Sequence, residues 1–185
     1  KSLPWENWIP ADAVFPVTGS CIRSTLMSIS DCQSIIKKAI VERLKKKYGF
    51  ERFPETGAKY KVVFWILKDI VILGLDTSGE GLHKRGYRRR TTTAPLKETL
   101  ASALLLISRW SPDKPLLDPF CGSGTIPIEA AMMGLNLAPG LNRSFDAQYW
   151  SNISQTLWQQ AVEEACDLAV RDKQLQIFGY DIDED

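Results

Sequence analysis

The chain has 185 residues, 44% of them hydrophobic and 24% charged, a composition typical of a globular protein with one domain or two small ones. Its formal net charge is only +1, so overall charge does not indicate a nucleic-acid partner, although local basic patches are compatible with one. No apolar run reaches membrane-spanning length, and residues 1–5 lack the basic and then apolar start of a signal peptide. We therefore expect no membrane association.

Cysteine and histidine are the residues that would indicate a zinc site. Four cysteines, at positions 21, 32, 121 and 166, lie far apart in the sequence, and His83 is the single histidine. No standard zinc spacing can be assembled from them. Free thiols in a reducing cytoplasm are the simpler interpretation, so we expect a cytoplasmic protein without a metal site.

The first 81 residues combine helical and β patterns. Apolar residues at three-and-four spacing predict one helix, and two runs rich in β-branched and aromatic residues predict a hairpin, although Lys68-Asp69 is not the preferred Asn-Gly turn. This order suits an α+β half-domain, with partner strands expected before residue 1. The expected elements are a strand at 14–20, a helix from an N-cap at Ser30 or Asp31 to Gly49, and strands at 60–67 and 70–75.

Residues 82–90 form the sharpest cluster of charge in the chain. Five lysine and arginine residues interleave here with Gly86 and Tyr87 in an expected loop. Such a segment can be a solvated linker, but arginines around an aromatic ring also bind phosphates and stack on unpaired bases. We favour RNA contact. The residues assigned to it are His83, Lys84, Arg85, Tyr87, Arg88, Arg89 and Arg90.

Residues 95–185 alternate helix, strand, helix, helix and strand, which is typical of a doubly wound parallel sheet. The expected elements are a helix from Pro95 to Trp110, a strand at 115–118, a helix from Ile126, a loop at 136–150, a helix at 153–170 and a strand at 175–180. The chain stops directly after its second strand there. We therefore expect this domain to be incomplete.

A glycine loop at 118–125 carries the chemistry. A strand that ends in Asp118 runs into Gly122-Ser-Gly124 and then a helix, so backbone N–H groups can approach a ligand at the strand end. A dinucleotide site is disfavoured because Pro127 replaces the third glycine. Asp181 also lies much further beyond Gly124 than the roughly 20 residues expected of such a site. A P-loop is excluded because Gly-Lys-Ser/Thr is absent.

Four motifs resemble those of the THUMP-linked class I methyltransferases, a family that modifies guanines in ribosomal or transfer RNA. The run Asp-Pro-Phe-Cys-Gly-Ser-Gly-Thr-Ile-Pro-Ile-Glu-Ala-Ala at 118–131 is similar to the family's first cofactor motif. The run at 81–88 resembles the signature that joins its two domains, 94–100 resembles its entry helix, and Gly-Tyr-Asp-Ile-Asp at 179–183 resembles its second cofactor motif. The overall pattern is most similar to the bacterial large-subunit rRNA guanine-N2 methyltransferases.

The resemblance implies an organisation and an activity. It implies a partial α+β THUMP-like, ferredoxin-like RNA-binding domain at 1–81, a basic linker at 82–94, and a truncated α/β Rossmann-like methyltransferase domain at 95–185. The implied activity is S-adenosyl-L-methionine-dependent methylation of guanine N2 in 23S rRNA. The family's catalytic Asn/Asp-Pro-Pro-Tyr motif does not occur in this sequence, so we assign no catalytic residue and expect this chain alone to be inactive.

The resemblance also implies roles for particular residues. Gly122 and Gly124 would lie against the methionine part of the cofactor, and Asp118 near its positively charged end. Asp181 would accept hydrogen bonds from the ribose, and Ile182 would pack on the adenine. The residues implied to bind the cofactor are Asp118, Phe120, Gly122, Gly124, Thr125, Asp181 and Ile182.

Two further residues of this region have two interpretations each. Asp183 is either a second polar contact or a surface residue. Cys121 could be a nucleophile of the kind that attacks pyrimidine C5, but its place within the glycine loop favours a small packed residue.

Two other functions remain open at this stage. One is a non-catalytic RNA-binding module with a methyltransferase-like scaffold. The other is an amino-methyltransferase acting on DNA or tRNA, because adenine-N6 enzymes share the Asp-Pro-Phe-x-Gly-Ser-Gly-Thr loop. DNA enzymes do not normally carry the front domain or the 82–90 signature, which counts against the DNA alternative.

Overall fold

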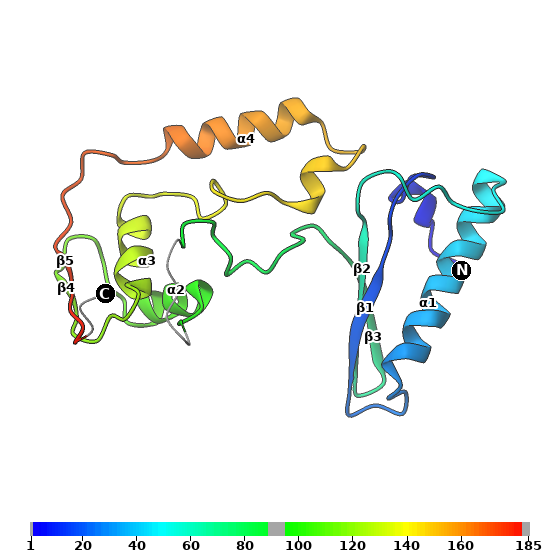
Figure 1. Ribbon diagram of the computed structural model, residues 1–185, viewed down its shortest axis with the longest axis horizontal. Coiled ribbons are helices and arrows are strands. Elements are labelled where there is room, and N and C mark those ends of the chain that lie inside the picture. Colours follow the sequence, from blue (N-terminus) through cyan, green and yellow to red (C-terminus); the bar gives the residue numbers. More distant parts are fainter. Residues whose placement is uncertain (1, 89–94, 183–185) are drawn as a thin grey trace. The chain divides into compact units, whose positions relative to one another are not determined.

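The computed structural model of the protein describes residues 2–88 and 95–182. The chain forms two compact units. Unit 1 consists of Lys1–Gly79 and Phe145–Gln155, and unit 2 of Glu80–Ser144 and Thr156–Asp185. Figure 1 shows the elements of both units in sequence colours. Unit 1 contains a mixed sheet with one long helix, and unit 2 contains parallel strands with helices, which confirms the expected α+β and α/β classes.

The sheet of unit 1 has the order β1-β2-β3. Strands β1 (Val17–Ile22) and β2 (Lys61–Leu67) are parallel, and β3 (Ile70–Asp76) returns antiparallel to β2, which confirms the predicted hairpin. Lys68 and Asp69 have φ values of 49° and 63°. Two consecutive left-handed residues are typical of the two-residue turn whose twist matches that of the strands, so this turn forms without its preferred Asn-Gly pair.

Helix α1 (Ile29–Tyr48) begins two residues earlier than an N-cap at Ser30 allows and three earlier than one at Asp31 allows. Ser28 is the N-cap, and its hydroxyl accepts a hydrogen bond from the backbone N–H of Asp31. The prediction of Ser30 or Asp31 was therefore wrong, because Ser28 has the extended backbone from which a hydroxyl reaches the third helical N–H group. Gly49 closes the helix in the left-handed conformation, as predicted.

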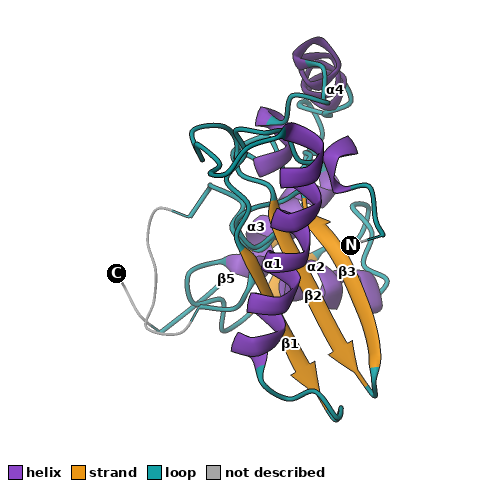
Figure 2. Cartoon of the chain, turned by 90° about the vertical axis from the view of Figure 1, so that its right-hand side faces the viewer, coloured by secondary structure: helices purple, strands orange, loops and turns teal. Residues whose placement is uncertain are grey.

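Figure 2 shows α1 lying over one face of the sheet, and the core of unit 1 lies between them. Alternate residues of β2, which are Val62, Phe64 and Ile66, are buried on this face. Helix α1 contributes Ile40 and Leu44. The apolar residues that recur every two positions in β2 and every three to four positions in α1 therefore pack together in one layer. A short 3-10 helix, η1 (Trp5–Asn7), adds a buried tryptophan to the same cluster.

A distant segment, 145–155, also belongs to the core of unit 1. It contains the 3-10 helix η2 (Asp146–Tyr149) and Trp150, whose ring stacks on that of Tyr60 with 4.6 Å between centroids. The Trp150 indole Nε1–H donates to the carbonyl oxygen of Lys59 at 2.8 Å. From the sequence we expected only a loop at 136–150, because these partners lie far away along the chain.

Unit 2 is built on a parallel pair of strands with Asp118 opposite Gly179. Helix α2 begins at Glu98 and not at Pro95 as predicted, because Lys97 keeps an extended backbone. None of the described helices is long and apolar enough to cross a membrane. The elements are α2 (Glu98–Ile107), β4 (Leu116–Asp118), α3 (Thr125–Gly134), α4 (Gln155–Asp167) and β5 (Ile177–Gly179).

Replacing Trp150 with alanine should destabilise unit 1 by about 3–5 kcal/mol, because it removes a buried indole that stacks and donates a hydrogen bond. Native-state hydrogen exchange at the amides of β2 would measure this loss. Tyr149→Ala is the matched control, since Tyr149 is 61% exposed and its removal should cost less than about 0.5 kcal/mol. Equal losses for the two variants would contradict the assignment of 145–155 to this core.

Candidate functional site

The carboxyl ends of β4 and β5 meet at one edge of the parallel strand pair. Asp118 is the last residue of β4, and Asp181 follows the end of β5 by two residues. The backbone N–H of Tyr180 donates to the carbonyl oxygen of Asp118 at 2.9 Å, and that of Cys121 donates to the carbonyl oxygen of Tyr180 at 2.8 Å. The structure thus brings together two acids that are far apart in the sequence, at the edge where α/β proteins bind ligands.

The glycine loop connects this edge to α3. Gly122 and Gly124 have φ values of 52° and 73°, and the backbone N–H of Gly122 donates to Oδ2 of Asp181 at 2.8 Å. A side chain at position 122 would meet nothing within 4 Å, so open space adjoins the loop. Gly124 caps α3 without a side-chain hydrogen bond. The N-terminal N–H groups of α3, which favour negative charge, therefore face the loop.

The residues around the loop differ in exposure. Phe120 and Ile182 are 86% and 98% exposed, so two large apolar side chains flank the strand ends in solvent. Asp118 is half-buried, and its Oδ1 accepts from the backbone N–H of Phe120 at 3.2 Å. Thr125, by contrast, is buried beneath the loop. The site therefore offers carboxylate acceptors, backbone donors and apolar surface together.

Cys121 packs inside the loop. A Cβ atom added at Gly179 would lie 3.1 Å from Cys121 Sγ and 3.3 Å from Pro127 Cγ. A side chain at position 179 would therefore press against Cys121 and Pro127, and glycine fits there without that crowding. This geometry favours the packed interpretation of Cys121 over a nucleophilic one.

Arg85 belongs to the basic segment, residues 82–90, and forms an ion pair with Glu129, which is buried in α3. Its guanidinium donates to both carboxylate oxygens of Glu129, at 3.3 and 3.2 Å, and to Oγ of Ser102 at 3.0 Å. The hydroxyl of Tyr87 donates to the same carboxylate at 2.9 Å. Burial raises the pKa of Tyr87, and the adjacent Glu129 carboxylate raises it further. Glu129 is only 2% exposed, so these donors replace the water that the carboxylate has lost.

Arg88 makes a second cluster of this kind, at the glycine loop itself. Its Nε donates to the carboxylate of Glu98 at 2.9 Å, and its Nη2 donates to the carbonyl oxygen of Leu96 at 3.1 Å. It also donates to Oγ of Ser123 and to Oγ1 of Thr125, both at 3.0 Å. Glu98 is 6% exposed and needs this cation for the same reason as Glu129.

Two other residues fix the path of the basic segment. A Cβ atom at Gly86, whose φ is 84°, would lie 1.8 Å from the carbonyl oxygen of Asn142, so only glycine fits there. Arg143 donates to the carbonyl oxygens of Gly81 at 2.8 Å and Glu80 at 2.7 Å. The signature-like run at 81–88 is therefore held by the segment around residue 142 as well as by the two helices.

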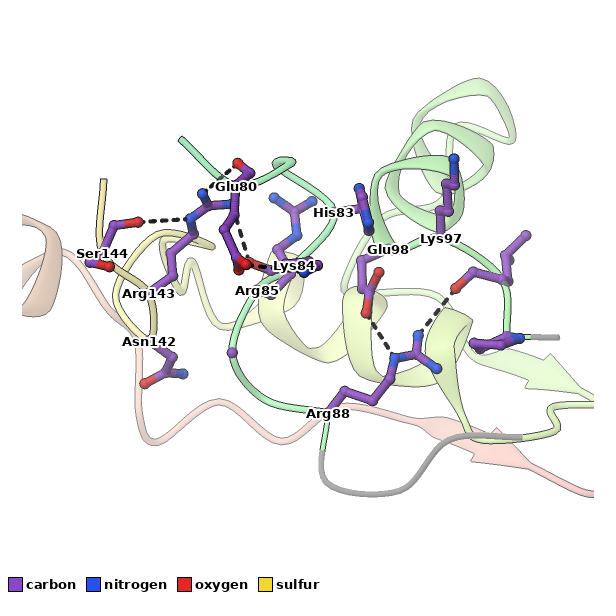
Figure 3. A pocket seen from close by; sticks show the side chains of 13 residues that line it. Glu80, His83, Lys84, Arg85, Arg88, Lys97, Glu98, Asn142, Arg143 and Ser144 are labelled. Atoms are coloured by element: carbon purple, nitrogen blue, oxygen red, sulfur yellow. Dashed lines mark hydrogen bonds and ion pairs between the residues drawn. The ribbon is translucent and has the colours of Figure 1, made fainter. Parts of the chain in front are cut away.

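A cavity of about 770 Å³ adjoins this segment. Figure 3 shows the side chains that line it. Lys84 and Lys97 are exposed there and His83 is half-buried, while Lys84 forms an ion pair with Glu80 at 3.1 Å. Arg89 and Arg90 lie outside the described residues. The lining residues are Glu80, His83, Lys84, Arg85, Gly86, Arg88, Pro95, Leu96, Lys97, Glu98, Asn142, Arg143 and Ser144.

Two family models match successive parts of the chain. A model described as RMKL-like, methyltransferase domain matches residues 85–185, more than half of the chain, and the THUMP domain model matches residues 1–76. The chain belongs to the RMKL-like methyltransferase family. The matches confirm the family resemblance of the sequence motifs, a THUMP domain followed by a class I methyltransferase domain.

Similar proteins have been named and solved. A protein of Bacillus subtilis (strain 168) named "Putative RNA methyltransferase YpsC" is 51% identical over 99% of this chain and 48% of its own length. A crystal structure of "a predicted N6-adenine-specific DNA methylase" from Listeria monocytogenes str. 4b F2365 is 55% identical, with a TM-score of 0.92 over 98% of this chain and 48% of its own. That of "SMU.472, a putative methyltransferase complexed with SAH" is 43% identical, with a TM-score of 0.91 over 99% of this chain and 49% of its own. The chain thus spans about half the length of these relatives.

The residues at the strand ends suit the cofactor of such methyltransferases. S-adenosylmethionine combines a charged amino-acid end, a ribose with two hydroxyls and an apolar adenine. The open glycine loop, the carboxylates of Asp118 and Asp181, and the exposed side chains of Phe120 and Ile182 offer matching chemistry. No cluster of His, Cys, Asp and Glu suited to a metal ion occurs within residues 2–88 and 95–182.

Glu98 and Glu129 also belong to this region, and neither was predicted from the sequence. The available signal was an apolar setting: Glu98 shares a helix face with the buried Ala101 and Leu105, and Glu129 is the one charged residue of α3. A carboxylate on a buried face requires a cationic or hydrogen-bonding partner. Which arginine supplied it could not be read from spacing alone.

Gly86→Ala should destabilise unit 2 by roughly 2–5 kcal/mol, because a methyl group would both overlap the Asn142 carbonyl and strain a left-handed backbone. Hydrogen exchange at the amides of α3 would report the loss. The control is Gly49→Ala in unit 1, where φ is also positive, at 71°, but no atom lies within 4 Å of the new Cβ. That change should cost only about 1–2 kcal/mol, measured at the amides of α1. Similar costs at both sites would refute close packing at Gly86.

Proposed function

We propose that this chain provides an RNA-binding THUMP domain and the cofactor-binding half of a cytoplasmic S-adenosylmethionine-dependent RNA methyltransferase, whose acceptor is guanine N2 of 23S rRNA. One observation carries the proposal: two parallel strand ends bring Asp118 and Asp181 to an open glycine loop. The naming of one relative as an RNA methyltransferase and the SAH in another support it. The rRNA guanine rests on the motif resemblance alone.

In this proposal each residue of the strand ends has one task. The loop at Gly122 and Gly124 lies along the methionine part of the cofactor, and Asp118 faces its positively charged end. Asp181 accepts hydrogen bonds from the ribose, and the exposed Ile182 packs on the adenine. When bound, the cofactor supplies an electrophilic methyl group. The chain's own contribution is to hold that group in a fixed direction, which is a large part of what methyl transfer requires.

We propose that the residues of the basic run at 82–90 do not all contribute equally to RNA binding. Arg85, Tyr87 and Arg88 direct their polar atoms to buried carboxylates, so less of their hydrogen-bonding capacity remains for phosphates. Lys84 and Lys97 are exposed at the cavity of Figure 3 and suit phosphate oxygens. His83 lines the same cavity.

A second candidate function is methylation of DNA, because the relative from Listeria monocytogenes is described as an N6-adenine-specific DNA methylase. The THUMP domain match favours RNA. Competition between duplex DNA and structured RNA for the protein would decide between them. Preferential binding of DNA would sink the RNA proposal.

The protein should bind S-adenosylhomocysteine but not NAD in a calorimetric titration. Asp181→Ala should weaken that binding roughly tenfold to a hundredfold, since hydrogen bonds to a charged acceptor contribute about 1.5–3 kcal/mol. Asp113→Ala is the matched control, because this exposed aspartate precedes β4 and pairs only loosely with Lys173 at 3.5 Å. Absent binding by the folded protein, or equal loss in both variants, would refute the cofactor site.

Reversing the charge of both exposed lysines of the cavity, in Lys84→Glu/Lys97→Glu, should weaken binding to structured RNA. The slope of log affinity against log salt should fall by roughly one for each phosphate that the variant no longer neutralises. Filter binding over a series of salt concentrations would measure it. The control Lys114→Glu/Lys173→Glu makes the same change in charge elsewhere in unit 2. If the control weakened binding equally, the affinity for RNA would depend on the net charge of the protein and not on this cavity.

A further inference from the structure

The glycine loop is held by Arg88, a residue from outside the loop. Gly122 and Gly124 both have left-handed backbones, and Ser123 lies between them. Glycines lose the most conformational freedom on folding, so a loop of this sequence has many alternatives to the observed conformation. The hydroxyl of Ser123 accepts a hydrogen bond from Arg88 Nη1 at 3.0 Å. This contact joins the centre of the loop to a segment more than thirty residues away along the chain.

Arg88 also holds the residue on which the loop ends. Its Nη2 donates to Oγ1 of Thr125, the first and buried residue of α3, at 3.0 Å. One planar guanidinium therefore grips Ser123 and Thr125 on either side of Gly124. The distance between those two residues, and with it the conformation of Gly124, is set by a rigid fork of donors.

The guanidinium is itself fixed from the opposite side. Its Nε donates to the buried carboxylate of Glu98 at 2.9 Å, and Nη2 donates to the carbonyl oxygen of Leu96. Figure 3 shows the contact between Arg88 and Glu98 at the start of α2. Since Glu98 is almost excluded from water, it strongly disfavours any rotamer that withdraws the cation. The anchor is thus as rigid as the start of α2.

We propose that Arg88 is a positioning residue for the glycine loop: it holds Ser123 and Thr125 in the ligand-ready conformation before any ligand arrives. The proposal rests on the cofactor site proposed above and deepens it. A loop fixed in advance loses less conformational entropy when a ligand binds, so affinity depends on the anchor even though Arg88 has no assigned contact with the ligand. The segment whose composition resembles an RNA-binding linker therefore serves the cofactor half.

Arg85 is a matched control within the same segment. It too is largely buried and pairs with a buried glutamate, but it donates to Glu129 and Ser102, a full turn or more from the loop. Arg85 and Arg88 should therefore contribute similarly to the stability of unit 2. Only Arg88 should affect the loop. Lysine substitutions are preferred to alanine, because each keeps a cation beside its carboxylate while losing the fork.

The first measurement is hydrogen exchange of the amides at 120–126 in the protein without added cofactor. Arg88→Lys should raise exchange at the loop at least tenfold relative to the unsubstituted protein, and Arg85→Lys should leave it within about twofold once differences in global stability are subtracted. Equal exchange in the two variants would overturn the positioning role. This result does not depend on whether the site binds S-adenosylmethionine.

The second measurement is a double-substitution cycle read by S-adenosylhomocysteine calorimetry. Arg88→Lys should weaken binding about tenfold, and Ser123→Ala should weaken it in the native background but add little once Arg88 is replaced. Arg85→Lys should bind like the native protein. If Ser123→Ala costs the same in both backgrounds, the serine acts directly on the ligand and the positioning role is refuted. If the native protein does not bind at all, the proposed cofactor site fails, while the exchange measurement still decides the role of Arg88.

Discussion

The structure of unit 2 depends on two carboxylates that its helices bury. Glu98 at the start of α2 and Glu129 within α3 are each almost excluded from water, and an unpaired charge in such a place would destabilise the fold by several kcal/mol. Each is neutralised by an arginine from a segment that has no regular secondary structure of its own, Arg88 and Arg85. The two helices thus acquire their electrostatic partners from outside themselves. The segment in turn acquires a fixed path from them, with Gly86 as the point at which the chain passes too close to Asn142 for any side chain.

This constraint changes the meaning of a basic run in the sequence. Seven residues at 82–90 were assigned to RNA because arginines and an aromatic residue in a loop are how proteins bind unpaired nucleotides. In the structure, the arginines at 85 and 88 and the tyrosine at 87 form hydrogen bonds with buried acids. Composition reports the charge of a side chain but not the charge that it faces, so a cluster of buried ion pairs and a nucleic-acid surface look alike in sequence. The glutamates in apolar helices were the feature that distinguishes them.

What could be predicted from the sequence was local. The hairpin, the Gly49 cap, and the run of strand, glycine loop and helix at 116–134 follow from periodicity and from the few residues that tolerate left-handed backbones. The strand ends could be expected to meet because parallel strands share an edge. Pairings across long stretches of chain could not be predicted, and Trp150 on Tyr60 and Arg88 on Ser123 are of this kind. The sequence around Trp150 or Arg88 does not indicate which residue will be its partner, because the fold alone brings the two together.

A pairing between distant parts of the chain also joins the two units through segment 145–155. Segment 145–155 leaves unit 2 at Ser144 and returns at Thr156, so it is covalently part of the methyltransferase half while its tryptophan completes the THUMP core. Hydrogen bonds within each unit hold the chain next to the crossing at 144–145. In unit 2, Arg143 binds the carbonyl oxygens of Glu80 and Gly81, and in unit 1 the N–H of Ala147 donates to the carbonyl oxygen of Thr77 at 3.0 Å. The chain crosses from one unit to the other three times, at 79–80, 144–145 and 155–156. A cut at Gly79 would remove Trp150 from the unit that it stabilises, so the domain boundary in sequence is not a boundary in the fold.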